Sequence, residues 1–272
     1  MRLLLAGLVF FCAEATAQLL RPSVPEGFGS KEWTVDGVKR TALVRLPLVK
    51  SNQPAPVVFG WHGHKGSSAN SIRSWGIGKL WPEAVFIFPQ GLPTASPLVD
   101  KEGRFPGWQT KAGAEGDRDL KFFDAMLASL PDEQKVDNRR VYSTGHSNGS
   151  VFSYLLWATR GEKLAAIATV AGVIAKNVSA YQPLPVLHVA GENDPLVKFE
   201  WQQATFTAVK KINGCAESPQ SWGEASGLKA ELFTSSKGAP LVTVVHSGKH
   251  EYPPGAGELI IRFLKENTIP AK

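Results

Sequence analysis

The hydrophobic positions of the chain alternate between short apolar runs and longer segments of helical period. Residues 33–46 alternate apolar and polar positions around Asp36-Gly37, a pattern typical of a β-hairpin. Short runs rich in apolar residues follow, and they indicate strands buried in a sheet. The predicted strands are residues 56–61, 84–88, 140–144, 164–170, 185–190 and 241–246.

Helical periodicity appears between several of these runs. Residues 117–130 repeat apolar side chains at helical spacing and carry acidic residues in the first turn. Further helices are predicted from Ser67 or Ser68, over 148–159 and over 257–265. Strands that alternate with helices predict an α/β fold, with a mostly parallel central sheet covered on both faces and an N-terminal β-hairpin. In such sheets the functional residues lie in loops beyond the carboxyl ends of the strands.

The first residues follow a different pattern. Met1-Arg2 is a short basic start, residues 3–12 are apolar but too few to span a bilayer, and Ala15-Thr16-Ala17 has the small-residue spacing of a signal peptidase site. We therefore expect residues 1–17 to be a cleaved signal peptide, residues 18–272 to form a single domain, and the product to be secreted or periplasmic. No later apolar run has the length of a membrane helix, so no stable membrane insertion is expected after cleavage.

Composition and charge narrow the classes of partner. The chain has 272 residues, of which 43% are hydrophobic and 20% charged, with a formal net charge of +6. The lysines and arginines are scattered rather than clustered, so no nucleic-acid partner is expected. After removal of Cys12 with the signal peptide, Cys215 has no cysteine to pair with. No cysteine or histidine spacing typical of a zinc site occurs, and no metal is expected.

The strongest chemical signal is Gly145-His146-Ser147-Asn148-Gly149, between a predicted strand and a predicted helix. This Gly-x-Ser-x-Gly pattern is typical of a nucleophile elbow, a sharp turn that exposes the serine hydroxyl. The flanking glycines lack the side chains that would clash in such a strained turn. The pattern therefore predicts that Ser147 is a nucleophile.

A serine nucleophile needs a base and an acid that orients the base. Asp194 lies in a loop just past a predicted strand and is the predicted acid, with Glu192 in the same loop as the alternative. The base should follow the acid in sequence, which leaves His246 and His250. We favour His250, because its loop is free to fold back over Ser147, whereas His246 lies at the edge of a strand.

The tetrahedral intermediate also needs hydrogen-bond donors. We expect an oxyanion hole built from the backbone N–H groups of Asn148 and His64, the latter in the loop after the first predicted buried strand. The other histidines have structural interpretations. His188 is expected in the core, His62 as a brace of its loop, and His146 along the elbow.

With these motifs, the chain resembles secreted α/β-hydrolase esterases. The group includes the feruloyl and acetylxylan esterases of carbohydrate esterase family 1 and related polyhydroxybutyrate depolymerase-like proteins. The residues that carry the resemblance are 62–67, 88–91, 136–142, 145–149, 191–197, 213–215 and 249–253. By position, the resemblance implies a triad of Ser147, Asp194 and His250. Ser150 is a departure, because relatives commonly have a second glycine there.

The resemblance implies a function and its alternatives. It implies a serine esterase that works through an acyl-enzyme without a metal or organic cofactor. Feruloyl or acetyl esters on plant polysaccharide are the leading substrates, followed by polyhydroxyalkanoates, with a peptidase as a weaker enzyme alternative. A catalytically silent binding protein of the same fold is the alternative of another class. Trp108 and Trp201 lie in predicted loops and are candidates to stack on a sugar or phenolic ring, with packing at the rim as an equal alternative. Substrate choice should depend on the loops 92–115 and 216–238.

Overall fold

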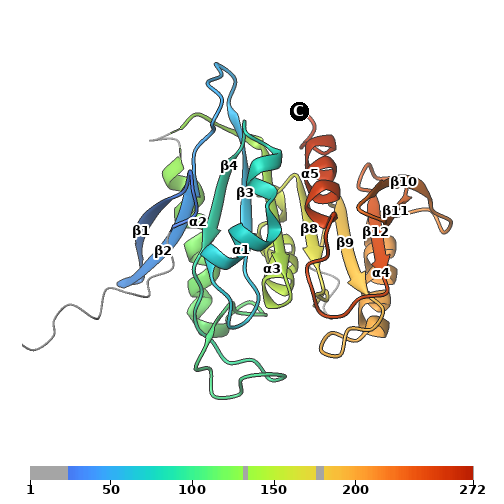
Figure 1. Ribbon diagram of the computed structural model, residues 1–272, viewed down its shortest axis with the longest axis horizontal. Coiled ribbons are helices and arrows are strands. Elements are labelled where there is room, and N and C mark those ends of the chain that lie inside the picture. Colours follow the sequence, from blue (N-terminus) through green and yellow to red (C-terminus); the bar gives the residue numbers. More distant parts are fainter. Residues whose placement is uncertain (1–23, 131–133, 176–180, 272) are drawn as a thin grey trace, which may run out of the picture.

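The computed structural model describes residues 24–130, 134–175 and 181–271, and in these residues the chain forms a ten-stranded mixed sheet (Figure 1). The strand order is β1-β2-β4-β3-β7-β8-β9-β12-β11-β10. The predicted signal peptide lies outside the described residues. The sheet strands are β1 (Gly29–Val35), β2 (Val38–Arg45), β3 (Ala55–Trp61), β4 (Val85–Pro89), β7 (Val136–His146), β8 (Ala166–Val170), β9 (Val186–Gly191), β10 (Gln220–Ala225), β11 (Leu228–Phe233) and β12 (Leu241–His246).

Helices cover both faces of this sheet (Figure 1). The α-helices are α1 (Ser68–Trp75), α2 (Arg118–Ser129), α3 (Asn148–Arg160), α4 (Phe199–Asn213) and α5 (Ala256–Glu266). Short 3₁₀ helices are η1 (Ile77–Leu80), η2 (Ala114–Asp117) and η4 (Gly161–Lys163). Helices α1 and α5 pack on one face, and α2, α3 and α4 pack on the other. Among the described residues, no helix is both long and apolar enough to cross a membrane.

The N-terminal hairpin forms where the sequence predicts it. Strands β1 and β2 pair antiparallel, and the turn residues Asp36 and Gly37 have φ values of 49° and 78°. Positive φ at both central positions is the geometry of a tight hairpin turn, which Asp-Gly favours. The hairpin joins the sheet through the antiparallel pairing of β2 with β4.

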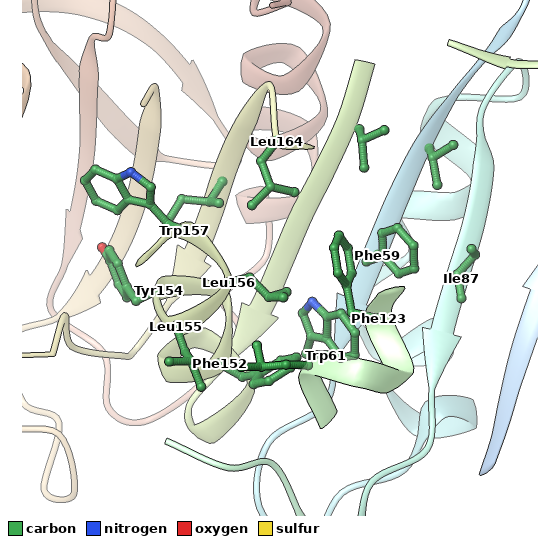
Figure 2. Close-up of a cluster of buried hydrophobic side chains, with 14 of the residues drawn as sticks. Phe59, Trp61, Ile87, Phe123, Phe152, Tyr154, Leu155, Leu156, Trp157 and Leu164 are labelled. Carbon is green, nitrogen blue, oxygen red and sulfur yellow. The ribbon is translucent and has the colours of Figure 1, made fainter. Parts of the chain in front are cut away.

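Strands β4, β3, β7, β8, β9 and β12 run parallel and form the middle of the sheet. All seven residues of β3 are buried, as its unbroken apolar run predicts. Aromatic side chains from β3, α2 and α3 fill the space on one face, among them Phe59, Trp61, Phe123 and Phe152 (Figure 2). The predicted α/β-hydrolase class, with a mostly parallel sheet and helices on both faces, is confirmed.

Two segments differ from the sequence-based expectation. Residues 199–213 form helix α4, so Trp201 lies on a helix and not in a loop. Three of the four buried residues of α4 are polar, namely Gln202, Thr205 and Asn213, so the helix has little apolar periodicity to reveal it. Residues 216–238, expected as a loop, contain the hairpin β10–β11 at the edge of the sheet. This segment extends the sheet rather than shaping a loop.

The long loop 92–115 is mostly irregular, as predicted, and is held by pairing with itself and by a contact with helix α2. A small two-stranded sheet, β5 (Leu92–Pro93) with β6 (Pro106–Gly107), closes it on itself. At its far end, Asp119 of α2 accepts a hydrogen bond from the Gln109 amide (2.9 Å) and forms a buried ion pair with Arg40 (2.8 Å). A buried charge is retained where it is paired and hydrogen-bonded. The loop is therefore held firmly where it passes the carboxyl ends of the strands.

Candidate active site

Ser147 lies on the sharp turn between β7 and α3. Its φ of 56° and ψ of −121° fall outside the regions that residues with side chains ordinarily adopt. A Cβ added at Gly145 would overlap the carbonyl group of Gly149, and one added at Gly149 would overlap the carbonyl group of Trp61. At both positions, therefore, there is no room for any side chain. The turn has the backbone strain and glycine spacing of a nucleophile elbow.

The structure brings Ser147, His250 and Asp194 together. Nε2 of His250 lies 2.7 Å from Oγ of Ser147, and Nδ1 of the same ring lies 2.7 Å from Oδ2 of Asp194. The carboxylate is only an acceptor, so Nδ1 carries the proton and Nε2 is free to accept the serine hydroxyl. The Asp194 side chain is fully buried, and its Oδ1 accepts the amides of Leu196 (2.8 Å) and Val197 (2.9 Å). This arrangement has the geometry that a nucleophile, a base and an orienting acid require.

The two alternatives that the sequence left open lie elsewhere. Glu192 is exposed, and its backbone amide donates to the carbonyl oxygen of His246. His246 ends β12, and its Nδ1 accepts the amide of Gly248 at 3.1 Å. Burial lowers the pKa of His246. His246 therefore braces the loop that carries His250.

The two residues predicted to supply oxyanion donors lie next to residues at the elbow: His64 follows Gly63, and Asn148 follows Ser147. A Cβ at Gly63, the neighbour of His64, would stand 3.4 Å from the Ser147 Cβ. In the part of the chain that the structure describes, the His64 amide has no hydrogen-bond partner. Asn148 is the first residue of α3, where a backbone N–H has no acceptor within the helix. Both backbone amides are therefore free to donate to a ligand.

Of three further histidines, His62 and His188 are fully buried and His146 is partly buried. Burial lowers the pKa of each to about 4. His62 accepts the Gly91 amide (2.9 Å), and its Nδ1 lies 2.7 Å from the Gly63 carbonyl, which confirms that it braces its loop. His188 bonds Tyr154 (2.8 Å) and Gln202 (3.1 Å), as expected of a core residue. His146 lies along the elbow, its ring centroid 5.0 Å from that of His250.

The two tryptophans proposed as substrate contacts have different positions. Trp108 is fully buried, donates from Nε1 to the His62 carbonyl (2.8 Å), and packs edge-on against Trp61 at 5.0 Å. Its ring is not available to a substrate, so that expectation is wrong. Trp201 is 44% exposed in the first turn of α4, which follows the loop of Asp194. Only the second of the two candidates remains.

Sequence reasoning did not find Asp100, a fully buried carboxylate of the long loop. Its Oδ2 lies 3.1 Å from Nε2 of His64 and accepts the amide of Phe105 at 2.9 Å. Burial raises the pKa of Asp100, but the hydrogen bonds from the Phe105 and Arg104 amides and from His64 outweigh it, so the net pKa is lowered. No local pattern in this Pro- and Gly-rich loop signals the contact.

Ser150 is the position that departs from the pattern of related esterases. Its hydroxyl is buried and, among the described residues, has no hydrogen-bond partner. The side chain packs against Gly172, in the loop after β8, where an added Cβ would overlap it. Among the described residues, no cluster of three or more His, Cys, Asp or Glu side chains is arranged to hold a metal ion.

Comparisons with known proteins are consistent with this geometry. No family model matches the chain. The chain is similar to a probable feruloyl esterase C of Aspergillus niger, with 27% identity over 216 residues that cover 75% of this chain and 73% of the relative. A feruloyl esterase D of Neurospora crassa is 28% identical over 229 residues, covering 79% and 75% of the two chains.

Solved structures agree on the fold. The acetyl xylan esterase from Aspergillus awamori matches with a TM-score of 0.68 at 14% identity, covering 87% of this chain and 99% of that one. At that identity the match shows the fold alone. The similarity to feruloyl esterases over most of the chain confirms the resemblance that the sequence motifs indicate.

Proposed function

We propose that this chain is a serine esterase that hydrolyses carboxylic esters through an acyl-enzyme. The observation that carries the proposal is the position of His250, 2.7 Å from both Ser147 Oγ and Asp194 Oδ2. A hydroxyl on a strained elbow, a base within reach of its proton and a buried acid on the other ring nitrogen are the parts that nucleophilic acyl transfer requires.

The steps follow from the atoms that are present. Nε2 of His250 takes the proton as Oγ of Ser147 attacks the ester carbonyl, and the Asp194 carboxylate stabilises the imidazolium that forms. The amides of His64 and Asn148 donate to the oxyanion. His250 then protonates the leaving alcohol, and a water molecule attacks the acyl-enzyme with the same base. No step requires a metal or an organic cofactor.

Feruloyl or acetyl esters on plant polysaccharide are the proposed substrates. The similarity to feruloyl esterases C and D, and the shared fold with an acetyl xylan esterase, support this class. Trp201, exposed near the loop of the acid, is a candidate to stack on a phenolic or sugar ring. The basic, apolar and small-residue pattern of residues 1–17 supports export to a place where such polymers occur.

A fluorophosphonate probe tests the activity class. The folded protein should be labelled at Ser147, and Ser147→Ala should abolish labelling and lower kcat by about 10⁶-fold. Folded protein that is not labelled would contradict the esterase proposal and favour a binding role. Methyl ferulate, acetylated xylan and polyhydroxybutyrate, compared side by side, then test the substrate class. We expect the first two to be hydrolysed, and preferential hydrolysis of polyhydroxybutyrate would overturn the substrate assignment.

A further inference from the structure

We propose that residues 100–108 of the long loop position both backbone donors of the oxyanion hole, and that Asp100 is the key positioning residue of this segment. The inference rests on the proposed function, because it deepens the role of the same site. It starts from one observation. The two residues proposed to supply the oxyanion donors, His64 and Asn148, both hydrogen-bond this segment through their side chains.

The first attachment is the side chain of His64. Its Nε2 donates to Oδ2 of Asp100 at 3.1 Å, and the two side chains are 6% and 1% exposed. The same Oδ2 accepts the amide of Phe105 at 2.9 Å. The next residue, Lys65, donates its own amide to the carbonyl oxygen of Pro106 at 2.9 Å. His64 is therefore fixed to the segment through both its side chain and its neighbouring peptide group.

The second attachment is the side chain of Asn148. Its Oδ1 accepts the amide of Trp108 at 2.7 Å, and its Nδ2 donates to the Trp108 carbonyl at 3.0 Å. These two hydrogen bonds resemble those between paired strands, and together they fix the orientation of the Asn148 side-chain amide. Trp108 is in turn immobilised, because its ring is fully buried and donates to the His62 carbonyl at 2.8 Å.

The side chains of His64 and Asn148 pack closely against the glycine that lies between the two attachments. A Cβ at Gly107 would stand 2.6 Å from Nδ1 of His64 and 3.1 Å from Oδ1 of Asn148, so both donor residues pack against this glycine. The loop itself is closed by the amides of Ser96 and Asp100, which bond each other's carbonyl oxygens at 2.8 and 2.9 Å. The segment therefore packs against the side chains of both donor residues at once, and its own hydrogen bonds define its shape.

This arrangement matters because oxyanion donors act through position. A donor contributes when it stands about 2.7–3.1 Å from the oxygen of the intermediate, and loss of one donor costs about 10²–10³ in kcat. The His64 and Asn148 amides come from different elements, the loop after β3 and the start of α3. The segment 100–108 links those elements through side chains that do not touch the reacting atoms.

The test compares four variants of the full chain. Asp100→Ala removes the acceptor of His64, and Asp100→Asn keeps a neutral acceptor of the same shape. Asn148→Ala removes the side chain that holds Trp108 but keeps the backbone donor. Glu102→Ala is the matched control, because this exposed carboxylate of the same loop pairs with the exposed Arg104 at 3.4 Å and does not contact His64.

We expect Asp100→Ala and Asn148→Ala to lower kcat on a small soluble ester by at least about 10-fold, with KM within about twofold of the starting protein. The inhibition constant of phenylboronic acid, whose tetrahedral adduct on serine occupies the oxyanion site, should rise in parallel. Asp100→Asn should recover most of kcat, and Glu102→Ala should leave all values unchanged. A rise in KM at constant kcat, or equal losses in Glu102→Ala, would overturn the positioning role.

A second readout does not depend on catalysis. Hydrogen exchange of the peptide covering residues 62–66 should be faster in Asp100→Ala than in the starting protein and in Glu102→Ala. Unchanged exchange there overturns the inference even if the enzyme is active. Failure of the starting protein to hydrolyse any ester or to react with the fluorophosphonate overturns the proposed function instead, so the two failures are distinguishable.

Discussion

Replacement of Asp194 by asparagine is a strong test of the proposed triad, because the surrounding backbone amides determine the orientation of the asparagine side chain. In the structure, Oδ1 of Asp194 accepts two backbone amides and Oδ2 accepts Nδ1 of His250. An asparagine has one oxygen, and placing its NH₂ group against two backbone N–H donors would set donor against donor. The oxygen therefore stays with the amides, and the NH₂ group faces His250. Nδ1 must then accept, which moves the ring proton to Nε2, opposite Ser147.

A protonated Nε2 cannot take the proton of the serine. We therefore expect Asp194→Asn to lower kcat/KM on a soluble ester by about 10⁴, or about 5.5 kcal/mol of transition-state stabilisation. Thermal unfolding should change little, because every hydrogen bond at the site keeps a partner. Glu192→Gln is the control, since this exposed residue of the same loop is the alternative acid. An Asp194→Asn variant within tenfold of the starting activity, or a large loss in Glu192→Gln, would refute the assignment.

Three further perturbations address the frame around the site. Gly149→Ala should lower the free energy of unfolding by about 3 kcal/mol in denaturant titrations, because its Cβ would overlap the Trp61 carbonyl; an unchanged midpoint contradicts this. Because Trp108 is buried, Trp108→Phe should lower thermal stability without changing KM for a polymeric ester. Because Trp201 is exposed, Trp201→Ala should raise KM and leave the free energy of unfolding within about 0.5 kcal/mol. The reverse pattern would indicate that Trp108 contacts the substrate. His188, whose pKa burial lowers to about 4, binds a proton in the unfolded but not the native chain between that value and its ordinary pKa of about 6.5. The contribution of His188 to the free energy of unfolding should therefore fall by up to about 1.4 kcal/mol per pH unit as pH drops through this window. His188→Gln should make the slope shallower by that amount and leave the contributions of His62 and His146, whose pKa values burial also lowers to about 4.

The parts of the site that sequence reasoning located are those with local causes. Gly145 and Gly149 flank Ser147 because carbonyl groups occupy the space where side chains would be. This requirement is visible in the sequence as a pattern of five consecutive residues. Asp194 follows a buried strand directly, so its place at the carboxyl edge of the sheet could be predicted from an apolar run and a turn. The fold class followed from the same alternation of strands and helices.

The features that sequence reasoning missed depend on packing between distant segments. Helix α4 buries Gln202, Thr205 and Asn213, and each is satisfied by hydrogen bonds to other elements, so its inner face is not apolar in the sequence. The burial of Trp108 comes from its contacts with Trp61 and Phe152, which are far away in the chain. Asp100 meets His64 across a loop, at a sequence distance of 36 residues. No window of neighbouring residues records such contacts.

Ser150, the position that departs from related esterases, packs against Gly172, and this contact predicts that substitutions at the two positions have coupled effects on stability. A Cβ at Gly172 would overlap Oγ of Ser150 and stand 2.5 Å from its Cβ, so rotating the hydroxyl does not make room. The next atom, the backbone carbon of Ser150, is 3.4 Å away, and Gly172 has a φ outside the left-handed region. Alanine should therefore fit at position 172 once the side chain of Ser150 is gone.

We expect Gly172→Ala alone to lower the free energy of unfolding by about 1–3 kcal/mol. Ser150→Gly alone should cost about 1 kcal/mol for glycine in a helix, offset in part because it removes a buried hydroxyl without a partner. The double variant should be more stable than the sum of the single changes by at least about 1 kcal/mol, measured by denaturant unfolding of all four proteins. Additivity within about 0.5 kcal/mol would show that the two positions do not share this space. A positive coupling would mean that a serine at position 150 is compatible with the elbow because residue 172 has no side chain.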